Sequence, residues 1–227
     1  MAKRVLNSLG LIAAALLLMA GCARTQQIPA DYHPDTSGWD DLIASDLSNC
    51  YYEPGSWVME DGVLYAEDHS TIWTNDEYQD FIMDLEFRVP EGANSGIFFR
   101  TKDRNNVLSA LEVQIHATTD GTKHGQCGAI YDLISPSTDA TKPAGEWNHY
   151  TITANKNKIY VVLNGEQIID MDINNWTEPH QNPDGTRHKF DRAIQTQTWA
   201  GPIGFQGIHG SAGEPVFFRN LKVKRLD

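Results

Sequence analysis

Residues 150–170 decide the fold class; they read YTITANKNKIYVVLNGEQIID. Tyr150–Ala154 and Lys158–Leu163 are rich in β-branched and aromatic residues, which favour strands, and a short polar stretch joins them. Asn164-Gly165 follows, and this dipeptide is typical of a tight hairpin because both residues tolerate a positive φ. The chain then enters Gln167–Asp170, so the stretch predicts successive strands connected by tight turns.

The chain beyond its N-terminal segment keeps this period of two and has almost no helical stripe. Further strand-like segments are Asp84–Val89, Ile97–Arg100, Leu111–His116, Gly204–Gln206, Val216–Phe218 and Leu221–Lys224. Many short strands separated by turn signals predict an all-β sandwich or jelly roll. Two irregular stretches, Asp132–Glu146 and Asn174–Arg192, are long for loops of a compact domain, and we expect binding loops or lids there.

The first residues predict export. Lys3 and Arg4 precede a largely apolar stretch, Val5–Ala20, which is short for a membrane span but fits the core of a signal peptide. Leu18-Met19-Ala20-Gly21-Cys22 resembles the lipobox of bacterial lipoproteins, in which cleavage leaves a lipidated cysteine as the new N-terminus. The alternative is an ordinary secretory signal followed by an incidental cysteine.

The expected organisation is a signal peptide over residues 1–21, a lipidated N-terminus and tether over residues 22–37, and one domain over residues 38–227. A lipid on Cys22 makes the membrane a partner of the chain and places it in the cell envelope. Ala23, rather than an aspartate, follows the cysteine, and this is compatible with sorting to the outer membrane, on its periplasmic or surface face.

Charge and cysteine content narrow the partners. The formal net charge is −12, and removal of Lys3 and Arg4 with the signal peptide makes it −14. Such a surface repels nucleic acid, so we expect a neutral ligand. Cys50 and Cys127 remain after lipidation of Cys22, and in an oxidising compartment they either pair or stay separate as buried thiols.

Leu111–His116 is the most informative strand. Its odd positions are apolar, whereas Glu112, Gln114 and His116 fall on the opposite face. One reading is an outer strand whose polar face is simply solvated. The other is a row of carboxylate, amide and imidazole that binds sugar hydroxyls and moves a proton.

Neighbouring segments supply further candidates. Asn94 lies at the start of the segment that ends in Arg100, whose guanidinium either faces a substrate oxygen or forms a surface ion pair. Gln206 and His209 lie in a glycine-rich stretch, where backbone approaches a ligand closely, although a histidine in such a loop is more often not catalytic. The histidines show no metal-ligand spacing. We therefore assign no metal ligand and no cofactor, and leave a divalent metal open.

In its order of segments the chain resembles the 3-keto-disaccharide hydrolase family over nearly the whole mature length. The segments that carry the resemblance are Tyr78–Phe81, Leu85–Arg88, Asn94–Arg100, Glu112–Ile115, Gly128–Ile134, Gly145–His149, Leu163–Gly165, Gly201–Gln206 and Phe218–Val223.

This resemblance implies a concanavalin-like jelly roll, made of two curved antiparallel sheets, with a carbohydrate site on its concave face. It also implies a 3-keto-glycoside substrate, supplied by a separate sugar 3-dehydrogenase. A ketone at C3 acidifies the proton on C2, so a modest base removes it and the enolate expels the glycosidic oxygen from C1. The site then needs a base, a group that stabilises the enolate oxygen and an acid for the leaving group.

The polar face and the family positions together suggest roles. We expect His209 or His116 as the base, Arg100 or Gln114 as the oxyanion-stabilising group, and Glu112 as the residue that orients the sugar or shuttles the proton.

Substrate binding is expected at Gln114, Gln206, Asn94 and Tyr131. The sequence departs from the family at two places. The family often has Gln-Asp-His-Gly where this chain has Gln206-Gly207-Ile208-His209-Gly210, and it tends to carry an aspartate at the position of His116.

Two other functions fit the sequence. A non-catalytic carbohydrate-binding lipoprotein would present a flat aromatic platform built from Trp57, Trp73 or Trp199. A conventional glycoside hydrolase would place two carboxylates across a cleft, and Asp84 and Glu86 lie on one strand face.

Overall fold

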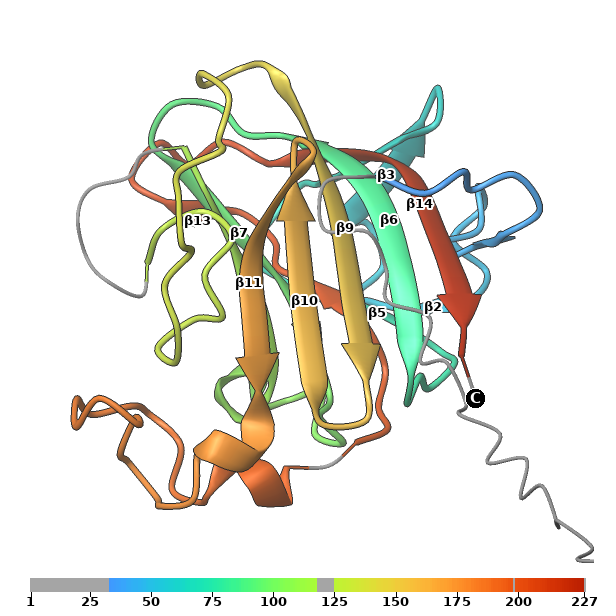
Figure 1. Cartoon of the computed structure of the whole chain (residues 1–227). Helices are drawn as coiled ribbons and strands as arrows, with labels where there is room; N and C mark the ends of the chain where they lie inside the picture. The colour runs from blue at the N-terminus through green and yellow to red at the C-terminus, as the bar shows by residue number, and fades with distance from the viewer. Residues whose placement is uncertain (1–32, 118–124, 198, 227) are drawn as a thin grey trace, which may run out of the picture.

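The computed structural model describes residues 33–117, 125–197 and 199–226. Over these ranges the chain is almost entirely β-structure, and its helical residues are confined to short 3-10 turns at Val107–Ser109, Ile173–Asn175 and Ile194–Thr196. The expected all-β fold is therefore confirmed (Figure 1). None of the helices in these ranges is both long and apolar enough to cross a membrane.

The larger sheet, called sheet A, has eight strands in the order β11-β10-β9-β6-β14-β4-β3, with β1 paired to β14. Its strands are β1 Asp40–Asp41, β3 Trp57–Glu60, β4 Val63–Ala66, β6 Phe81–Arg88, β9 Trp147–Asn155, β10 Lys158–Leu163, β11 Glu166–Asp172 and β14 Phe217–Arg225. The long strands β6, β9, β10, β11 and β14 lie side by side in Figure 1.

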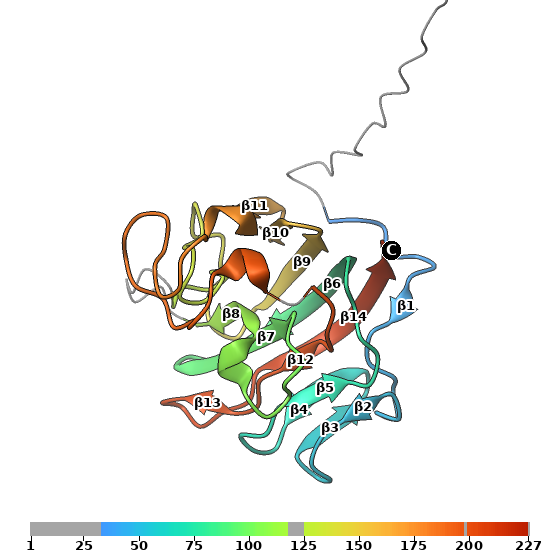
Figure 2. The ribbon, with the colours of Figure 1, turned by 90° about the horizontal axis from the view of Figure 1, so that it is seen from below.

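The smaller sheet, called sheet B, has six strands in the order β13-β7-β12-β5-β2, with β8 paired to β7. Its strands are β2 Cys50–Tyr51, β5 Ile72–Thr74, β7 Ala93–Phe99, β8 Leu111–His116, β12 Gly204–Phe205 and β13 His209–Gly210. All pairings in both sheets are antiparallel. Figure 2 shows the two layers from below, with β7, β8 and β12 facing sheet A.

The core lies between the sheets because alternate residues of each strand point inward. On β8 the inward side chains are Leu111, Val113 and Ile115, and on β9 they are Tyr150 and Ile152, all fully buried. Aromatic contacts join the layers, and the rings of Phe205 and Phe218 meet edge to face at 5.0 Å. The period of two in the sequence therefore assigns the core face of these strands correctly.

Residues 150–170 lie in β9, β10 and β11, as predicted. Asn164 and Gly165 both have positive φ, 51° and 88°, which is the backbone of a type I′ hairpin turn. Lys156, with φ 51°, makes the preceding turn. A single 3-10 turn at Ile194–Thr196 follows the second irregular stretch.

Cys50 and Cys127 are separate thiols, the first half-buried and the second fully buried. Burial raises the pKa of both. Cys22 lies outside the described residues, so its lipidation stays a prediction.

Candidate functional site

The candidate site lies on the outer face of sheet B, away from the core. On β8 this face carries Glu112, Gln114 and His116, and their register partners on β7 are Phe98, Gly96 and Asn94. Glu112 and Gln114 are only 8% and 3% exposed. The polar face of β8 is therefore not simply solvated, because Glu112 and Gln114 are enclosed by the protein.

Glycine at position 96 makes room for the Glu112 carboxyl. A methyl group on Gly96 would overlap Glu112 Oε1. Gln114 also contacts this carboxyl. In the side-chain orientation that directs its amide nitrogen toward Glu112, Gln114 donates hydrogen bonds to Glu112 Oε1 (3.1 Å) and to the Ser95 carbonyl oxygen (3.2 Å). The strand pairing of β7 and β8 thus fixes the position of the carboxyl.

Burial raises the pKa of Glu112 to about 7, and the nearby Lys189 ammonium opposes this rise. Near neutral pH the carboxyl is consequently present in both protonation states. A group of this kind accepts and returns a proton at little free-energy cost, which is the property required of a general base or acid.

Lys189 enters the site from the irregular segment after β11. Its Nζ lies 3.9 Å from Glu112 Oε2, 5.0 Å from the centroid of the Tyr131 ring and 5.2 Å from that of Phe190. Tyr131 is 37% exposed, and its backbone N–H donates to the Glu112 carbonyl oxygen at 2.9 Å. Tyr131 and Lys189 therefore both lie beside Glu112. The sequence suggested Tyr131 as a site residue, but it gave no signal for Lys189.

A second polar group lies at the end of β8. Asn94 is the register partner of His116 on one side and of His209 on the other, so the three residues form a row across β8, β7 and β13. His116 is half-buried and His209 is exposed. The structure brings both candidate histidines to the same face as Glu112.

Two amide oxygens on this face need a hydrogen bond. Asn94 Oδ1 and Gln206 Oε1 are shielded from solvent and have no hydrogen-bond partner among the described residues. Gln206 is held beside β7, since its N–H donates to the Gly96 carbonyl oxygen at 2.9 Å and its own carbonyl oxygen accepts from Ser95 Oγ at 2.9 Å. Hydroxyl groups of a sugar would satisfy such acceptors.

Arg100 does not join this group. Its fully buried guanidinium donates to the Lys156 carbonyl oxygen (2.7 Å) and lies 3.6 Å from Asp80 Oδ1 and 5.1 Å from the Trp199 ring centroid. Burial lowers its pKa to about 10. Within the described residues these contacts place Arg100 between β7 and the β9–β10 turn, where it serves packing and not the site around Glu112.

The tryptophans do not form an open platform. Trp57 and Trp73 are 3% and 2% exposed. Trp73 stacks on Phe98 at 5.8 Å on the outer face of sheet B, beside Glu112's register row, and Ala110 and Val107 pack against this pair. These four apolar residues form one side of the candidate site.

Both carboxylates of β6 already have side-chain partners. Glu86 Oε2 accepts from Arg219 Nε at 2.6 Å and from Asn220 Nδ2 at 2.7 Å, whereas Asp84 contacts two histidines. Both lie on sheet A, away from Glu112 on sheet B. This pair is therefore a poor candidate for the two flanking carboxylates of a conventional glycoside hydrolase.

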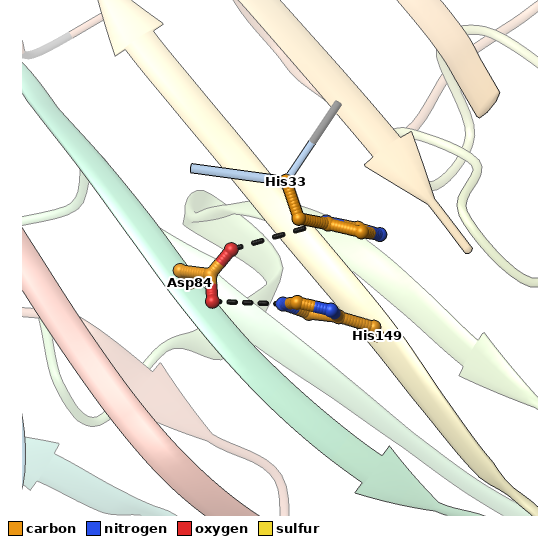
Figure 3. A group of neighbouring side chains, drawn as sticks. All are labelled: His33, Asp84 and His149. Atoms are coloured by element: carbon orange, nitrogen blue, oxygen red, sulfur yellow. Dashed lines mark hydrogen bonds and ion pairs between the residues drawn. The ribbon is translucent and has the colours of Figure 1, made fainter. Parts of the chain in front are cut away.

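The Asp84 group is drawn in Figure 3, and its ligand atoms on His33, Asp84 and His149 lie within 4.8 Å of one another. The two imidazole rings stack at 3.5 Å with an interplanar angle of 12°. Parallel stacked rings cannot both direct their in-plane lone pairs at one ion, so the arrangement does not suit a metal.

Hydrogen bonds instead use these atoms. His33 Nε2 accepts from the Gly165 N–H (2.9 Å), while its Nδ1 meets Thr151 Oγ1 (2.8 Å), which donates to Asp84 Oδ2 (2.5 Å). His149 Nε2 meets Asp84 Oδ1 at 2.8 Å. Burial, together with His149, lowers the pKa of His33 to about 4, which keeps the ring neutral. We call this group the His33 clasp, since it fixes the start of the described chain to sheet A.

A surface pocket of about 230 Å³ lies at the other edge of sheet B, lined by Tyr51 and residues 102–105. Tyr51 lies on β2, four strands from β8, residues 102–105 belong to the β7–β8 connection, and none of these residues contributes to the Glu112 group. The pocket is therefore separate from the Glu112 site.

Comparison with known proteins identifies relatives of the chain. Residues 34–224 match the 3-keto-alpha-glucoside-1,2-lyase-like domain family. A protein of Bacteroides thetaiotaomicron named 3-keto-disaccharide hydrolase is 27% identical over 207 residues, which cover 77% of this chain and 71% of that protein.

Solved structures show the same fold. A candidate glycosyl hydrolase from Parabacteroides distasonis superposes with a TM-score of 0.78 at 35% identity, covering 83% of this chain and 99% of the other. A carbohydrate binding module from Bacillus subtilis has a TM-score of 0.51 at 14% identity, covering 80% and 99%, and shares the fold alone. The expected jelly roll is thereby confirmed.

Proposed function

Because the chain belongs to the 3-keto-alpha-glucoside-1,2-lyase-like family, we propose that it cleaves the glycosidic bond of 3-keto-glycosides, with Glu112 moving the proton of C2. The observation that carries this proposal is the enclosed Glu112 carboxyl, whose pKa burial raises to about 7. It supplies a proton-transfer group poised at neutral pH on the sheet face where Asn94 and Gln206 offer unpaired amide oxygens.

The chemistry follows from the ketone. Glu112 takes the proton from C2, and the C2–H electron pair delocalises onto the C3 oxygen as an enolate. The enolate reforms the ketone as the C1–O bond breaks, leaving a C1=C2 double bond and a protonated leaving group. Addition of water across that bond then gives net hydrolysis. No covalent nucleophile is required, in contrast to a retaining glycosidase.

The roles of the histidines shift accordingly. We assign proton abstraction to Glu112 in place of His116 or His209, since the enclosed carboxyl lies in the middle of the polar face. His116 and His209 lie on the same face, and we assign protonation of the leaving oxygen to one of them. Gln114 holds the carboxyl, and Asn94, Gln206 and Tyr131 contact the sugar.

Kinetics of E112Q test the assignment. We expect kcat on a 3-keto-glucoside to fall by about 100- to 10,000-fold, since Gln keeps the shape but accepts no proton. E86Q is the matched control, because it changes a carboxylate of sheet A that pairs with Arg219, and it should retain wild-type turnover. Near-normal turnover by E112Q would reject the role of Glu112, and sugar binding without turnover by the wild type would favour a binding protein.

The proposed function also requires that the protein meets its substrate in the cell envelope. We propose that Cys22 carries a lipid that holds the domain in the cell envelope, where a sugar 3-dehydrogenase supplies its substrate. Labelling cells with a radioactive fatty acid should label the wild type and not C22S. Equal labelling of both, or none of the wild type, would contradict the lipid anchor.

A further inference from the structure

Lys189 takes no part in the proton transfers proposed for Glu112 and the histidines, yet its ammonium lies beside the Glu112 carboxyl. It comes from the segment after β11, whereas Glu112 lies on β8, and the two charged atoms are 3.9 Å apart. The side chains are 16% and 9% exposed. Both charges are therefore largely removed from solvent.

The chain fixes Lys189 through its backbone. Its N–H donates to the Asp132 carboxylate, and the Asp132 carbonyl oxygen accepts from Asn182 Nδ2 at 3.2 Å. Trp176 Nε1 in turn donates to Asn182 Oδ1 at 2.7 Å. Since the neighbouring Tyr131 N–H bonds to the Glu112 carbonyl oxygen, one network ties both irregular segments to β8 around the carboxyl.

The ion pair is poorly suited to a stabilising role alone. A separation of 3.9 Å is too long for a hydrogen bond, and removing two charges from water costs more free energy than such a contact returns. The ammonium also lies 5.0 Å and 5.2 Å from the ring centroids of Tyr131 and Phe190, which offer only weak cation–π contacts. Within the described residues Lys189 Nζ donates no hydrogen bond, so its N–H groups can bind a third oxygen next to the carboxylate.

We propose that Lys189 is a catalytic residue whose ammonium binds the C3 oxygen of the substrate and stabilises the enolate that Glu112 creates. This inference rests on the proposed function. C2 and C3 are bonded neighbours, so the base and the cation must also be neighbours, as Glu112 and Lys189 are. Negative charge passes from Glu112 to the C3 oxygen beside Lys189, and then to the departing C1 oxygen, which takes up a proton.

The test compares K189M with the wild type on a 3-keto-glucoside over a range of pH. Loss of one preorganised group that stabilises an oxyanion lowers kcat by about 100- to 1000-fold, and we expect that range with a smaller change in KM. The rising limb of the pH profile should also move to higher pH, because the Lys189 charge opposes the rise in the pKa of Glu112. A merely structural lysine would not move the profile in this direction.

Two controls make the result decisive. K158M removes a partly exposed lysine that pairs with Asp170 and Asp172 on sheet A and should leave kcat unchanged. K189A with added methylammonium should recover part of the lost turnover if the cation matters. If K189M does not fold, the rescue of K189A, followed with a thermal melt as a folding control, decides the question.

Failure of this inference differs from failure of the proposed function. Turnover by folded K189M within about threefold of the wild type, less than 1 kcal/mol on the barrier, overturns the role of Lys189 while leaving Glu112 in place. The same holds if K189A gains nothing from methylammonium. If the wild type itself does not cleave the 3-keto-glucoside, the proposed function is wrong and the role of Lys189 is rejected with it.

Discussion

At the scale of single residues, alternation along β8 identified Glu112, Gln114 and His116 as one face, and the structure confirms it. The sequence could not identify Lys189, because it lies in an irregular segment far along the chain from β8 and has no periodic pattern. Nor could it show that Arg100 turns away, since its φ of 55° ends the strand alternation at that residue. Both depend on how loops pack, which local pattern does not encode.

The protonation of Glu112 predicts the pH dependence of catalysis. A base works when deprotonated, and burial raises the pKa of this carboxyl to about 7. Activity should therefore rise with pH through roughly neutral pH and not near 4, where an ordinary glutamate titrates. A profile of kcat/KM against pH in the wild type measures this, and a plateau that extends down to pH 5 would contradict the assignment.

Because Gly96 lies against the Glu112 carboxyl, we predict that its replacement by alanine strongly lowers activity. The G96A methyl group would overlap Glu112 Oε1 and push the carboxyl from its position. We expect kcat to fall by about 100-fold or more, as for a displacement of roughly 1 Å of a catalytic group. Gly96 has no positive φ that alanine would strain, so any fall in the thermal midpoint reports the displaced Glu112 side chain. Wild-type kcat in G96A would show that the Glu112 position is not critical.

At the scale of elements, turn chemistry and alternation predicted the β9–β10–β11 hairpins, since each signal is local. The predicted segment Gly204–Gln206 forms β12. The short strands β2 and β13 were not predicted, because two-residue strands exist only through their partners on β5 and β7. The two irregular segments contain no strand, as predicted, and their role as binding loops or lids stays a prediction. The segment after β11 brings Lys189 to within 3.9 Å of Glu112.

Substitutions of Asn164 test how much the turn between β10 and β11 contributes to stability. The Asn164 side chain accepts from the His149 N–H (2.9 Å) and donates to the Ala140 carbonyl oxygen (2.7 Å) and Asn148 Oδ1 (2.8 Å). N164A loses these bonds and strains a positive φ, so we expect it to lose about 2–4 kcal/mol of unfolding free energy. N164G, which relieves the strain, should lose about 1–2 kcal/mol less. Equal urea denaturation midpoints for the two variants would refute a contribution from backbone strain.

At the scale of the whole molecule, the sandwich separates two polar clusters onto different sheets. The His33 clasp lies on sheet A at the start of the described chain, whereas the Glu112 site lies on sheet B. Family resemblance predicted the jelly roll and the Glu112 face. It gave no indication of the clasp, because His33 meets its partners on β6 and β9 only after folding (Figure 3).

The clasp predicts how stability depends on pH. Burial lowers the pKa of His33 to about 4, so between that value and the ordinary 6.5 the unfolded chain binds more protons than the folded one. The stability that His33 contributes is therefore complete above pH 6.5 and is lost as pH falls toward 4.

Urea denaturation of the wild type and H33Q checks this expectation. H33Q should be less stable than the wild type at pH 7.5, and the difference should shrink at pH 4.5. A difference that stays constant or grows on acidification would contradict a neutral His33 in the folded state.

The most direct test of the central claim is deuterium incorporation at C2 when the wild type and E112Q cleave a 3-keto-glucoside in D₂O. The parent glucoside, which has no ketone, and the 3-keto product incubated without enzyme are the controls. Mass spectrometry of quickly quenched samples should show an early 3-keto sugar product with one deuterium at C2 for the wild type, and almost no product for E112Q or from the parent glucoside. A product without deuterium at C2, or equal cleavage of the parent glucoside, would contradict proton removal by Glu112 as the basis of the reaction.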